Sequence, residues 1–338
     1  MIPSVDTLVS LVRLLYAETD LPEPFGLLAE FIECRRTQQV AEPIIDQPNR
    51  RLAARAKKIA ALLDAPDALQ LAVGLAQGSA LSEKLVTRAE TMLGQLLLGN
   101  LAEQAFEHIY RTVIGTTELT LEDDRSARND TDYRVLNGGR RQVFRINIKL
   151  HGARFRNASD MVNLEPEDCF PLATYKIHHG LQKQEQEVLP YLWVVIDCPI
   201  AATEVGKQIP RPWVGLIALA YASKEIKRKR KLEERVVEHL LDSTTEPFVQ
   251  VVTRLRSEVA AACWYVLSAR RANQILREKL FERVFAVRVK SFARNYAGAE
   301  LNMHFSLRHD MTPLQRFLGI IKDKGLHGIT AELERGTV

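Results

Sequence analysis

The chain has 338 residues, of which 46% are hydrophobic and 26% are charged, and its formal net charge is +4. These proportions are ordinary for a globular protein and exclude a collagen-like or low-complexity chain. The length predicts about two domains of roughly 150 residues each. The mildly basic balance permits a nucleic-acid partner without requiring one.

No apolar run approaches the roughly 20 residues that a membrane-spanning helix needs. The first residues also lack the charged start and apolar centre of a signal peptide. We therefore expect a cytoplasmic protein without a membrane partner. The cysteines lie far apart and form no CxxC pair, which predicts buried, reduced thiols and argues against a zinc site or a disulfide framework; they are Cys34, Cys169, Cys198 and Cys263.

Residues 1–95 are predicted to form a helical region. Apolar residues recur at helical spacing from Val5 to Leu15, and a helix-like stretch with one apolar face runs from Leu81 to Leu98. A further helix then carries Glu103 and Glu107. From about Ser223 to the end, long charged and periodic segments predict a second helical region, residues 223–338.

Between these regions, residues 96–222 have the character of an α/β core with a mixed sheet. A strand-like run lies near Glu118–Glu122, a hairpin follows, and residues 166–186 are helix-like. Two short, strongly apolar runs, each preceded by proline, are typical of buried strands; they are Tyr191–Asp197 and Trp213–Leu219.

The hairpin is the most informative feature of the sequence. A run from Asp132 to Leu136 is followed by Asn137-Gly138-Gly139, and a second run ends at Lys149. An Asn-Gly pair between two such runs is a strong hairpin signal. The hairpin brings Asp132 close to Lys149, an arrangement suited to holding a divalent metal beside an attacking water.

This arrangement resembles the PD-(D/E)xK nuclease superfamily, the fold of many restriction endonucleases, over roughly residues 98–221. The resemblance implies a restriction-endonuclease-like core with a mixed central sheet, flanked by N- and C-terminal helical regions. It also implies that Asp132 ligates Mg²⁺ and that Lys149 positions or activates water. Two positions depart from the pattern: Thr131 replaces the proline, and Asn147 replaces the acidic residue, so the second ligand brings no negative charge.

The superfamily often adds a glutamate from an upstream helix, and Glu103 is the residue that we assign to this role. Glu107 is an alternative one helical turn away. Asp130 would share a strand face with Asp132 and so could supply the missing charge. Further acidic residues precede it, although each is more often a solvated turn residue; they are Glu122, Asp123 and Asp124.

Three basic residues are candidates for contact with DNA. Arg154 and Arg156 flank Phe155 in the loop after the lysine strand, and arginine makes bidentate contacts with phosphate or guanine. Lys176 lies on the helix that follows. Each of the three could equally be an ordinary surface residue.

Two other patterns are weaker signals. His178 and His179 are adjacent on that helix and diverge by about 100°, so they do not readily hold one ion together. The basic run 227–231 could track a phosphate backbone, but such runs are more often a solvated helix face.

Together these features predict a Mg²⁺-dependent endodeoxyribonuclease acting on double-stranded DNA, most concretely a homodimeric type II restriction endonuclease. The alternative is a non-catalytic DNA-binding or assembly protein that keeps the fold, which Asn147 favours. A helical scaffold with no nucleic-acid role is a third hypothesis. The sequence contains no GxxxxGK[ST], GxSxG or HExxH motif, which argues against the corresponding enzyme classes.

Overall fold

The computed structural model describes residues 81–115, 118–124, 131–222, 229–244, 246–291 and 296–336, together with residues 73 and 338. The helices predicted before residue 81 therefore lie outside the described residues, as do Asp130, Cys34 and positions 227 and 228 of the basic run. None of the helices within the described ranges combines the length and apolar character that crossing a membrane requires.

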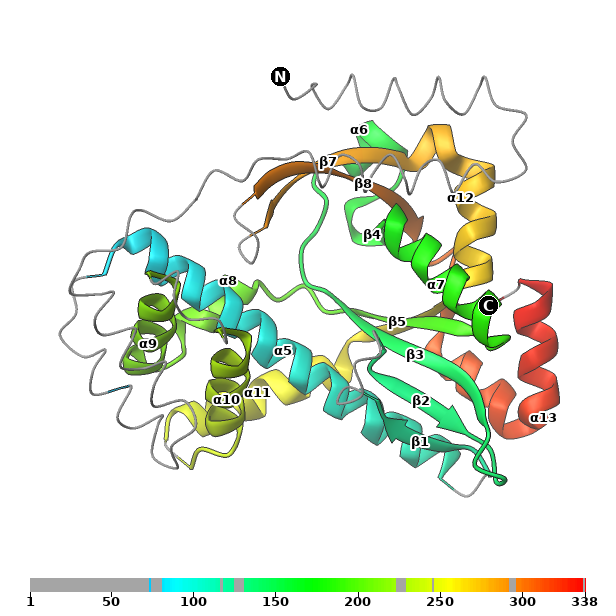
Figure 1. Cartoon of the computed structure of the whole chain (residues 1–338), viewed down its shortest axis with the longest axis horizontal. Coiled ribbons are helices and arrows are strands. Elements are labelled where there is room, and N and C mark those ends of the chain that lie inside the picture. Colours follow the sequence, from blue (N-terminus) through cyan, green and yellow to red (C-terminus); the bar gives the residue numbers. More distant parts are fainter. Residues whose placement is uncertain are drawn as a thin grey trace.

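The centre of the molecule is a six-stranded mixed sheet with the strand order β1-β2-β3-β5-β6-β9 (Figure 1). Only the pair β3–β5 is parallel, and all the other neighbours are antiparallel. The mixed sheet predicted from the sequence is therefore confirmed. Its strands are β1 (Thr120–Asp123), β2 (Tyr133–Leu136), β3 (Gln142–His151), β5 (Tyr191–Asp197), β6 (Cys263–Ser268) and β9 (Thr312–Pro313).

A second, three-stranded antiparallel sheet has the order β4-β8-β7. Its first strand is inserted in the chain between β3 and β5, whereas the other two come from the last quarter of the chain. The strands are β4 (Cys169–Ala173), β7 (Val284–Ser291) and β8 (Tyr296–Ser306).

Helices pack on both faces of the central sheet. Helix α5 reaches beyond the sheet, and a group of helices surrounds its beginning (Figure 1). Helix α5 begins after Ser82, whose side chain accepts a hydrogen bond from the amide of Leu85 at 3.4 Å. The helices are α5 (Glu83–Ile114), α6 (Ala158–Val162), α7 (Thr174–Glu187), α8 (Ala202–Lys207), α9 (Arg211–Ala222), α10 (Lys229–Leu241), α11 (Phe248–Ala261), α12 (Ala269–Arg283) and α13 (Leu314–Arg335).

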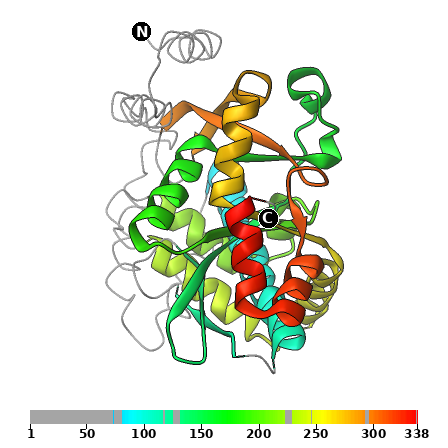
Figure 2. The same cartoon turned by 90° about the vertical axis from the view of Figure 1, so that its right-hand side faces the viewer.

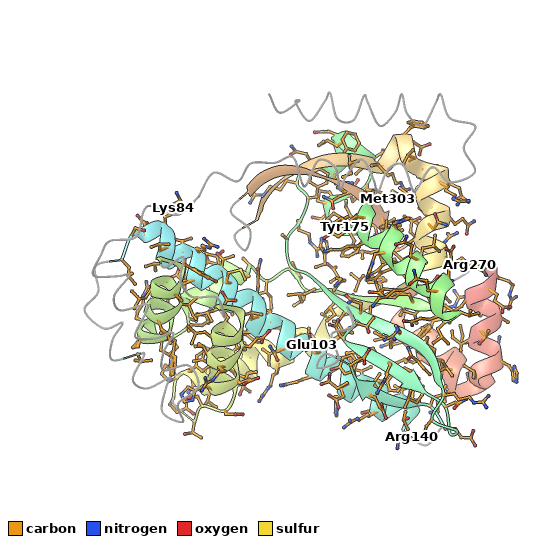
Figure 3. The ribbon with its side chains drawn as sticks, viewed as in Figure 1. Lys84, Glu103, Arg140, Tyr175, Arg270 and Met303 are labelled. Atoms are coloured by element: carbon orange, nitrogen blue, oxygen red, sulfur yellow. The ribbon has the colours of Figure 1, made fainter. Side chains whose placement is uncertain are left out.

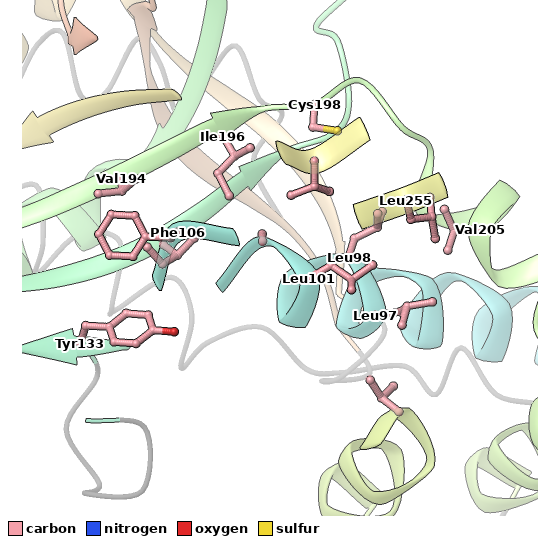
Figure 4. Packing of buried hydrophobic residues seen from close by; sticks show 14 of the residues in the cluster. Leu97, Leu98, Leu101, Phe106, Tyr133, Val194, Ile196, Cys198, Val205 and Leu255 are labelled. Carbon is pink, nitrogen blue, oxygen red and sulfur yellow. The ribbon is translucent and has the colours of Figure 1, made fainter. Parts of the chain in front are cut away.

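Alternation along β5 divides the interior into two layers, because successive side chains of a strand point to opposite faces. Val194 and Ile196 belong to a cluster with α5 and α13, and Figure 4 shows them facing Phe106 and Leu101 of α5. The intervening side chains belong to a second cluster with α7, α12 and the smaller sheet, and α7 and α12 lie side by side in Figure 2; these side chains are Tyr191, Trp193 and Val195.

The predicted hairpin is present, but its turn is longer than an Asn-Gly pair. Strand β2 ends at Leu136 and β3 begins at Gln142. The side chain of Asn137 accepts hydrogen bonds from the amides of Gly139 and Arg141 at 3.1 and 2.9 Å, and Arg140 takes the left-handed conformation with φ 57°. Asn137 therefore organises the turn through its side chain.

Helices α5 and α8 cross at two glycines. A Cβ atom on Gly94 would lie 1.9 Å from the carbonyl oxygen of Ala202, and one on Gly206 would lie 2.0 Å from the carbonyl oxygen of Glu90. Any larger residue would force these backbones apart. The pair of glycines therefore sets how closely α8 packs on α5.

Three predictions about secondary structure are wrong. Trp213–Leu219 lies inside helix α9, because a short apolar run suits a buried helix as well as a buried strand. Residues 166–186 contain strand β4 as well as α7. The region after Ser223 is not wholly helical, since β6, β7, β8 and β9 lie within it and β6 and β9 complete the central sheet.

The thiol prediction is correct for two of the cysteines that the structure describes. Cys169 and Cys198 are buried and free, whereas Cys263 is exposed. Cys263 is the first residue of β6 and pairs with Asp197, the last residue of β5, so it lies at the rim of the sheet.

Candidate active site

The centre of the candidate site is a polar row along one face of β3. The residues at every second position, Arg145, Asn147, Lys149 and His151, are polar, whereas the residues between them are apolar and face α5. The pairing of Asn147 with Trp193 and of Lys149 with Val195 on β5 places the row on the side that carries α7. The polar face of β3 therefore lies on the same side of the sheet as α7.

Asp132 lies immediately before β2 and opposite this row. Its amide donates to the carbonyl oxygen of Ile146 at 3.1 Å, and its carboxylate accepts the amide of Ile148 at 2.5 Å. The pairing of β2 with β3 begins at Tyr133 and Ile146. The amide of Ile148 lies beyond this pair, and the Asp132 carboxylate accepts its hydrogen bond in place of a main-chain carbonyl. The hairpin thus fixes Asp132 beside the polar face of β3.

Lys149 is the electrostatic focus of the site. The pKa of Lys149 is lowered from 10.5 to about 8. Burial is the largest cause and the charge of Lys176 acts in the same direction, whereas Asp132 and Glu103 oppose the shift. Lys149 on β3 therefore lies within electrostatic reach of three charged side chains, which come from α5, the residue before β2 and α7. The charges that act on Lys149 are thus one ammonium and two carboxylates.

Glu103 reaches the site from the opposite layer to Lys176. Figure 3 labels Glu103 on α5, and it labels Tyr175, the neighbour of Lys176, on α7. The hydroxyl of Tyr133 donates to the main-chain oxygen of Glu103 at 3.3 Å, which ties this turn of α5 to the start of β2. Glu107 instead pairs with Arg111 at 2.5 Å.

The side chains around Lys149 offer oxygen donors for a divalent cation but do not enclose one. Among the described residues, no three histidine, cysteine or acidic side chains are grouped so as to hold a metal ion. The oxygen donors near Lys149 are the carboxylates of Asp132 and Glu103 and the amide of the buried Asn147. Mg²⁺ in phosphoryl-transfer sites is held by one or two carboxylates plus substrate phosphates and water, so this set fits that mode but not a closed protein cage.

Comparisons with protein-family models, with curated proteins and with solved structures find no match for this chain. Only its own residues therefore bear on its function.

The three predicted DNA-contacting residues differ in their surroundings. Arg154 forms a two-pronged ion pair with Asp197, in which its Nη2 lies 3.2 Å from Oδ2. Burial would raise the pKa of Asp197, but hydrogen bonds from His151 and Arg154 outweigh it and lower the pKa below its ordinary value. Arg156 and Lys176 are exposed. The guanidinium of Arg154 is thus engaged within the protein.

The acidic residues considered as extra ligands are engaged elsewhere. Glu122 forms ion pairs with Arg134 and Arg140 at 3.0 and 3.1 Å. Asp124 is buried against Arg145, with Nη1 to Oδ2 at 2.7 Å. Asp123 is exposed on the outermost strand.

Two groups beside the site were not anticipated from the sequence. Arg145 is buried between Asp124 and Glu187, and His151 is buried with its Nδ1 3.2 Å from Asp197. The signal for both was present in the alternation of Arg145, Asn147, Lys149 and His151. A half-exposed strand would show the same pattern, and only the tertiary structure reveals that this polar face is covered.

Proposed function

We propose that this protein is a Mg²⁺-dependent endodeoxyribonuclease. The proposal rests on one observation: Lys149, partly buried on a central strand, lies within electrostatic reach of Asp132, Glu103 and Lys176. The order α5-β1-β2-β3-α7-β5, with α6 and β4 inserted between β3 and α7, supports it, because the resemblance to PD-(D/E)xK nucleases implies a helix, a three-strand meander, a helix and a strand. The further strand expected after β5 is helix α9.

In this proposal each side chain has a distinct role. Asp132 and Glu103 hold the cation, and the amide oxygen of Asn147 is the third protein donor. Bound there, the cation stabilises charge on the phosphate and lowers the pKa of a water. Lys149 orients that water and balances the charge that develops on the phosphate. Lys176, exposed at the start of α7, binds a phosphate oxygen of the DNA backbone.

Within this proposal, the protein acts as a homodimeric type II restriction endonuclease. A type II restriction endonuclease must cut both strands of a duplex, and a twofold homodimer presents one site to each strand. The described helices α8–α11, on the side away from the smaller sheet, offer surface for sequence recognition or for the second protomer. A cytoplasmic location would suit this role.

Asn147 favours a second candidate, a DNA-binding or assembly protein with the same fold and no competent metal site. An amide brings no charge to the cation, so affinity for Mg²⁺ falls relative to a carboxylate at this position. The two candidates differ in whether the protein cuts DNA or only binds it.

The deciding experiment incubates purified protein with plasmid and phage DNA in Mg²⁺, Mn²⁺ or EDTA. Discrete fragments that require the metal, and that Lys149→Ala reduces by about 10²-fold or more, are expected of the nuclease. The matched control is Lys207→Ala, which removes an exposed lysine paired with Glu204 on α8. Binding without cutting, unchanged by Lys149→Ala, would establish the second candidate, and no salt-sensitive binding would exclude both.

A further inference from the structure

Arg145 is the most heavily engaged buried cation near the site. Its side chain is 10% exposed, and its Nε and Nη2 donate to the two carboxylate oxygens of Glu187 at 2.5 and 3.1 Å. Its Nη1 donates to Asp124 at 2.7 Å and to the hydroxyl of Thr131 at 3.1 Å. One guanidinium on β3 thus contacts the residue after β1, the end of α7 and the residue before Asp132.

The contacts of Thr131 close a triangle. Its hydroxyl donates to the same carboxylate oxygen of Asp124 that Arg145 contacts, at 2.9 Å. Asp124 and Thr131 are 1% and 2% exposed, so these groups are shielded from water. Removing one partner from such a shielded network leaves the remaining buried polar groups without one of their hydrogen bonds, and neither water nor another side chain replaces it.

The triangle is linked directly to the candidate ligand. The main-chain amide of Asp124 donates to the carbonyl oxygen of Asp132 at 3.0 Å, and Thr131 is bonded covalently to Asp132. Asp132 is therefore held through its preceding residue, its carbonyl oxygen, its amide and its carboxylate. The last two contacts are with β3, the strand that carries Arg145.

The burial of these charges calls for an explanation beyond stability. An ion pair removed from water contributes little net stability, because desolvation offsets most of the attraction. The network does, however, fix geometry, since the N–H donors of a planar guanidinium point in fixed directions within one plane.

We propose that Arg145 is a positioning residue, which acts through Asp124 and Thr131 to hold the carboxylate of Asp132 beside Lys149. The inference rests on the proposed function only in that Asp132 is taken to bind the metal ion. The geometry itself has a reporter that needs no activity, namely the amide of Ile148, which donates to that carboxylate.

The test compares Thr131→Val with Thr131→Ser. Valine matches threonine in shape but lacks the hydroxyl, and serine keeps the hydroxyl. Amide hydrogen exchange is followed by NMR on protein labelled at isoleucine, with Ile196 of β5 as the internal reference. We expect Thr131→Val to raise exchange at Ile148 by about tenfold relative to Ile196, and Thr131→Ser to change the ratio less than about threefold.

Arg145→Lys, which keeps the charge but loses the bidentate contact, is expected to resemble Thr131→Val. If exchange rises equally at both amides, or does not change at Ile148, the network has only a structural role and the inference is overturned. The valine and serine pair decides the question even if the arginine variant fails to fold.

A second measurement is tied to activity. In Thr131→Val, the Mg²⁺ concentration for half-maximal cleavage is expected to rise about tenfold while the KM for DNA stays unchanged. An unchanged Mg²⁺ dependence in an active variant would contradict the role in metal binding. If the wild-type protein cuts no DNA, the proposed function fails, whereas the exchange ratio still decides whether Arg145 positions Asp132.

Discussion

Lys149 on β3 lies within electrostatic reach of Lys176 on α7, and burial together with this second ammonium lowers the pKa of Lys149 from 10.5 to about 8. A lysine that titrates near neutral pH is a suitable partner for a phosphate and a water whose protonation changes during hydrolysis. The two carboxylates nearby keep the shift from being larger.

Lys176→Gln is expected to raise the pKa of Lys149 above 8, because it removes the nearby positive charge while leaving burial in place. The measurement is an NMR pH titration of isotopically labelled lysine methylene groups. Lys176→Arg keeps the charge and should leave the titration near its wild-type midpoint. An identical midpoint in both variants would show that the two lysines do not interact.

Lys149→Met is expected to stabilise the protein at pH 7 by roughly 1–3 kcal/mol, because it removes a charge that folding buries at a cost. The lowered pKa means that the unfolded chain holds this proton more tightly than the folded one. Wild-type stability therefore rises between pH 8 and 10.5, and the advantage of the variant shrinks over the same interval.

Denaturant unfolding at pH 7 and near pH 10.5 measures this difference in the free energy of unfolding. Lys322→Met on α13 removes an exposed lysine and serves as the control, with little effect at either pH. A destabilised Lys149→Met protein at pH 7 would contradict the argument from burial.

Asn147→Asp is expected to increase the stabilisation of the protein by Mg²⁺. It places a second carboxylate on the buried face beside Asp132, where two like charges repel unless a cation lies between them. The melting temperature with and without about 10 mM Mg²⁺ measures the effect by linkage. Asn157→Asp makes the same change at an exposed position and should show no added response to the metal.

Arg156→Ala is expected to weaken DNA binding at all sequences by a few-fold and to reduce the dependence of affinity on salt by about one counterion. Arg154→Ala should instead lower the free energy of unfolding by about 1–3 kcal/mol, because Asp197 loses its two-pronged partner in a partly buried position. Filter binding at several salt concentrations and denaturant unfolding separate the two roles. Equal effects of both variants in either assay would contradict this division.

Gly206→Ala is expected to destabilise the protein by about 3 kcal/mol or more, since its Cβ would lie 2.0 Å from a carbonyl oxygen of α5. Gly99→Ala is the matched control, because a Cβ there meets nothing within 4 Å and alanine favours the helix by about 0.5–1 kcal/mol. Thermal unfolding of the two variants should therefore shift in opposite directions.

Elements that depend on neighbouring residues could be predicted from the sequence, whereas elements that depend on distant pairing could not. The hairpin from Asp132 to Lys149 and the strand Tyr191–Asp197 were predictable, because alternation and turn residues act within a few positions. Trp213–Leu219 was misassigned, since an apolar run carries no period that separates a buried strand from a buried helix. The sequence does not reveal β6 and β9 as strands of the sheet, because β6 joins it by pairing with β5 and β9 by pairing with β6, both far away in the chain.

The sequence by itself determined that β3 has a polar and an apolar face and that a hairpin brings Asp132 to its side. Only the tertiary structure decided that Glu103 and Lys176 meet Lys149 from opposite layers, and that Arg145 ties Asp124 and Thr131 to α7. The reason is physical: charge and burial depend on which distant segments pack together, whereas alternation depends only on neighbours along the chain.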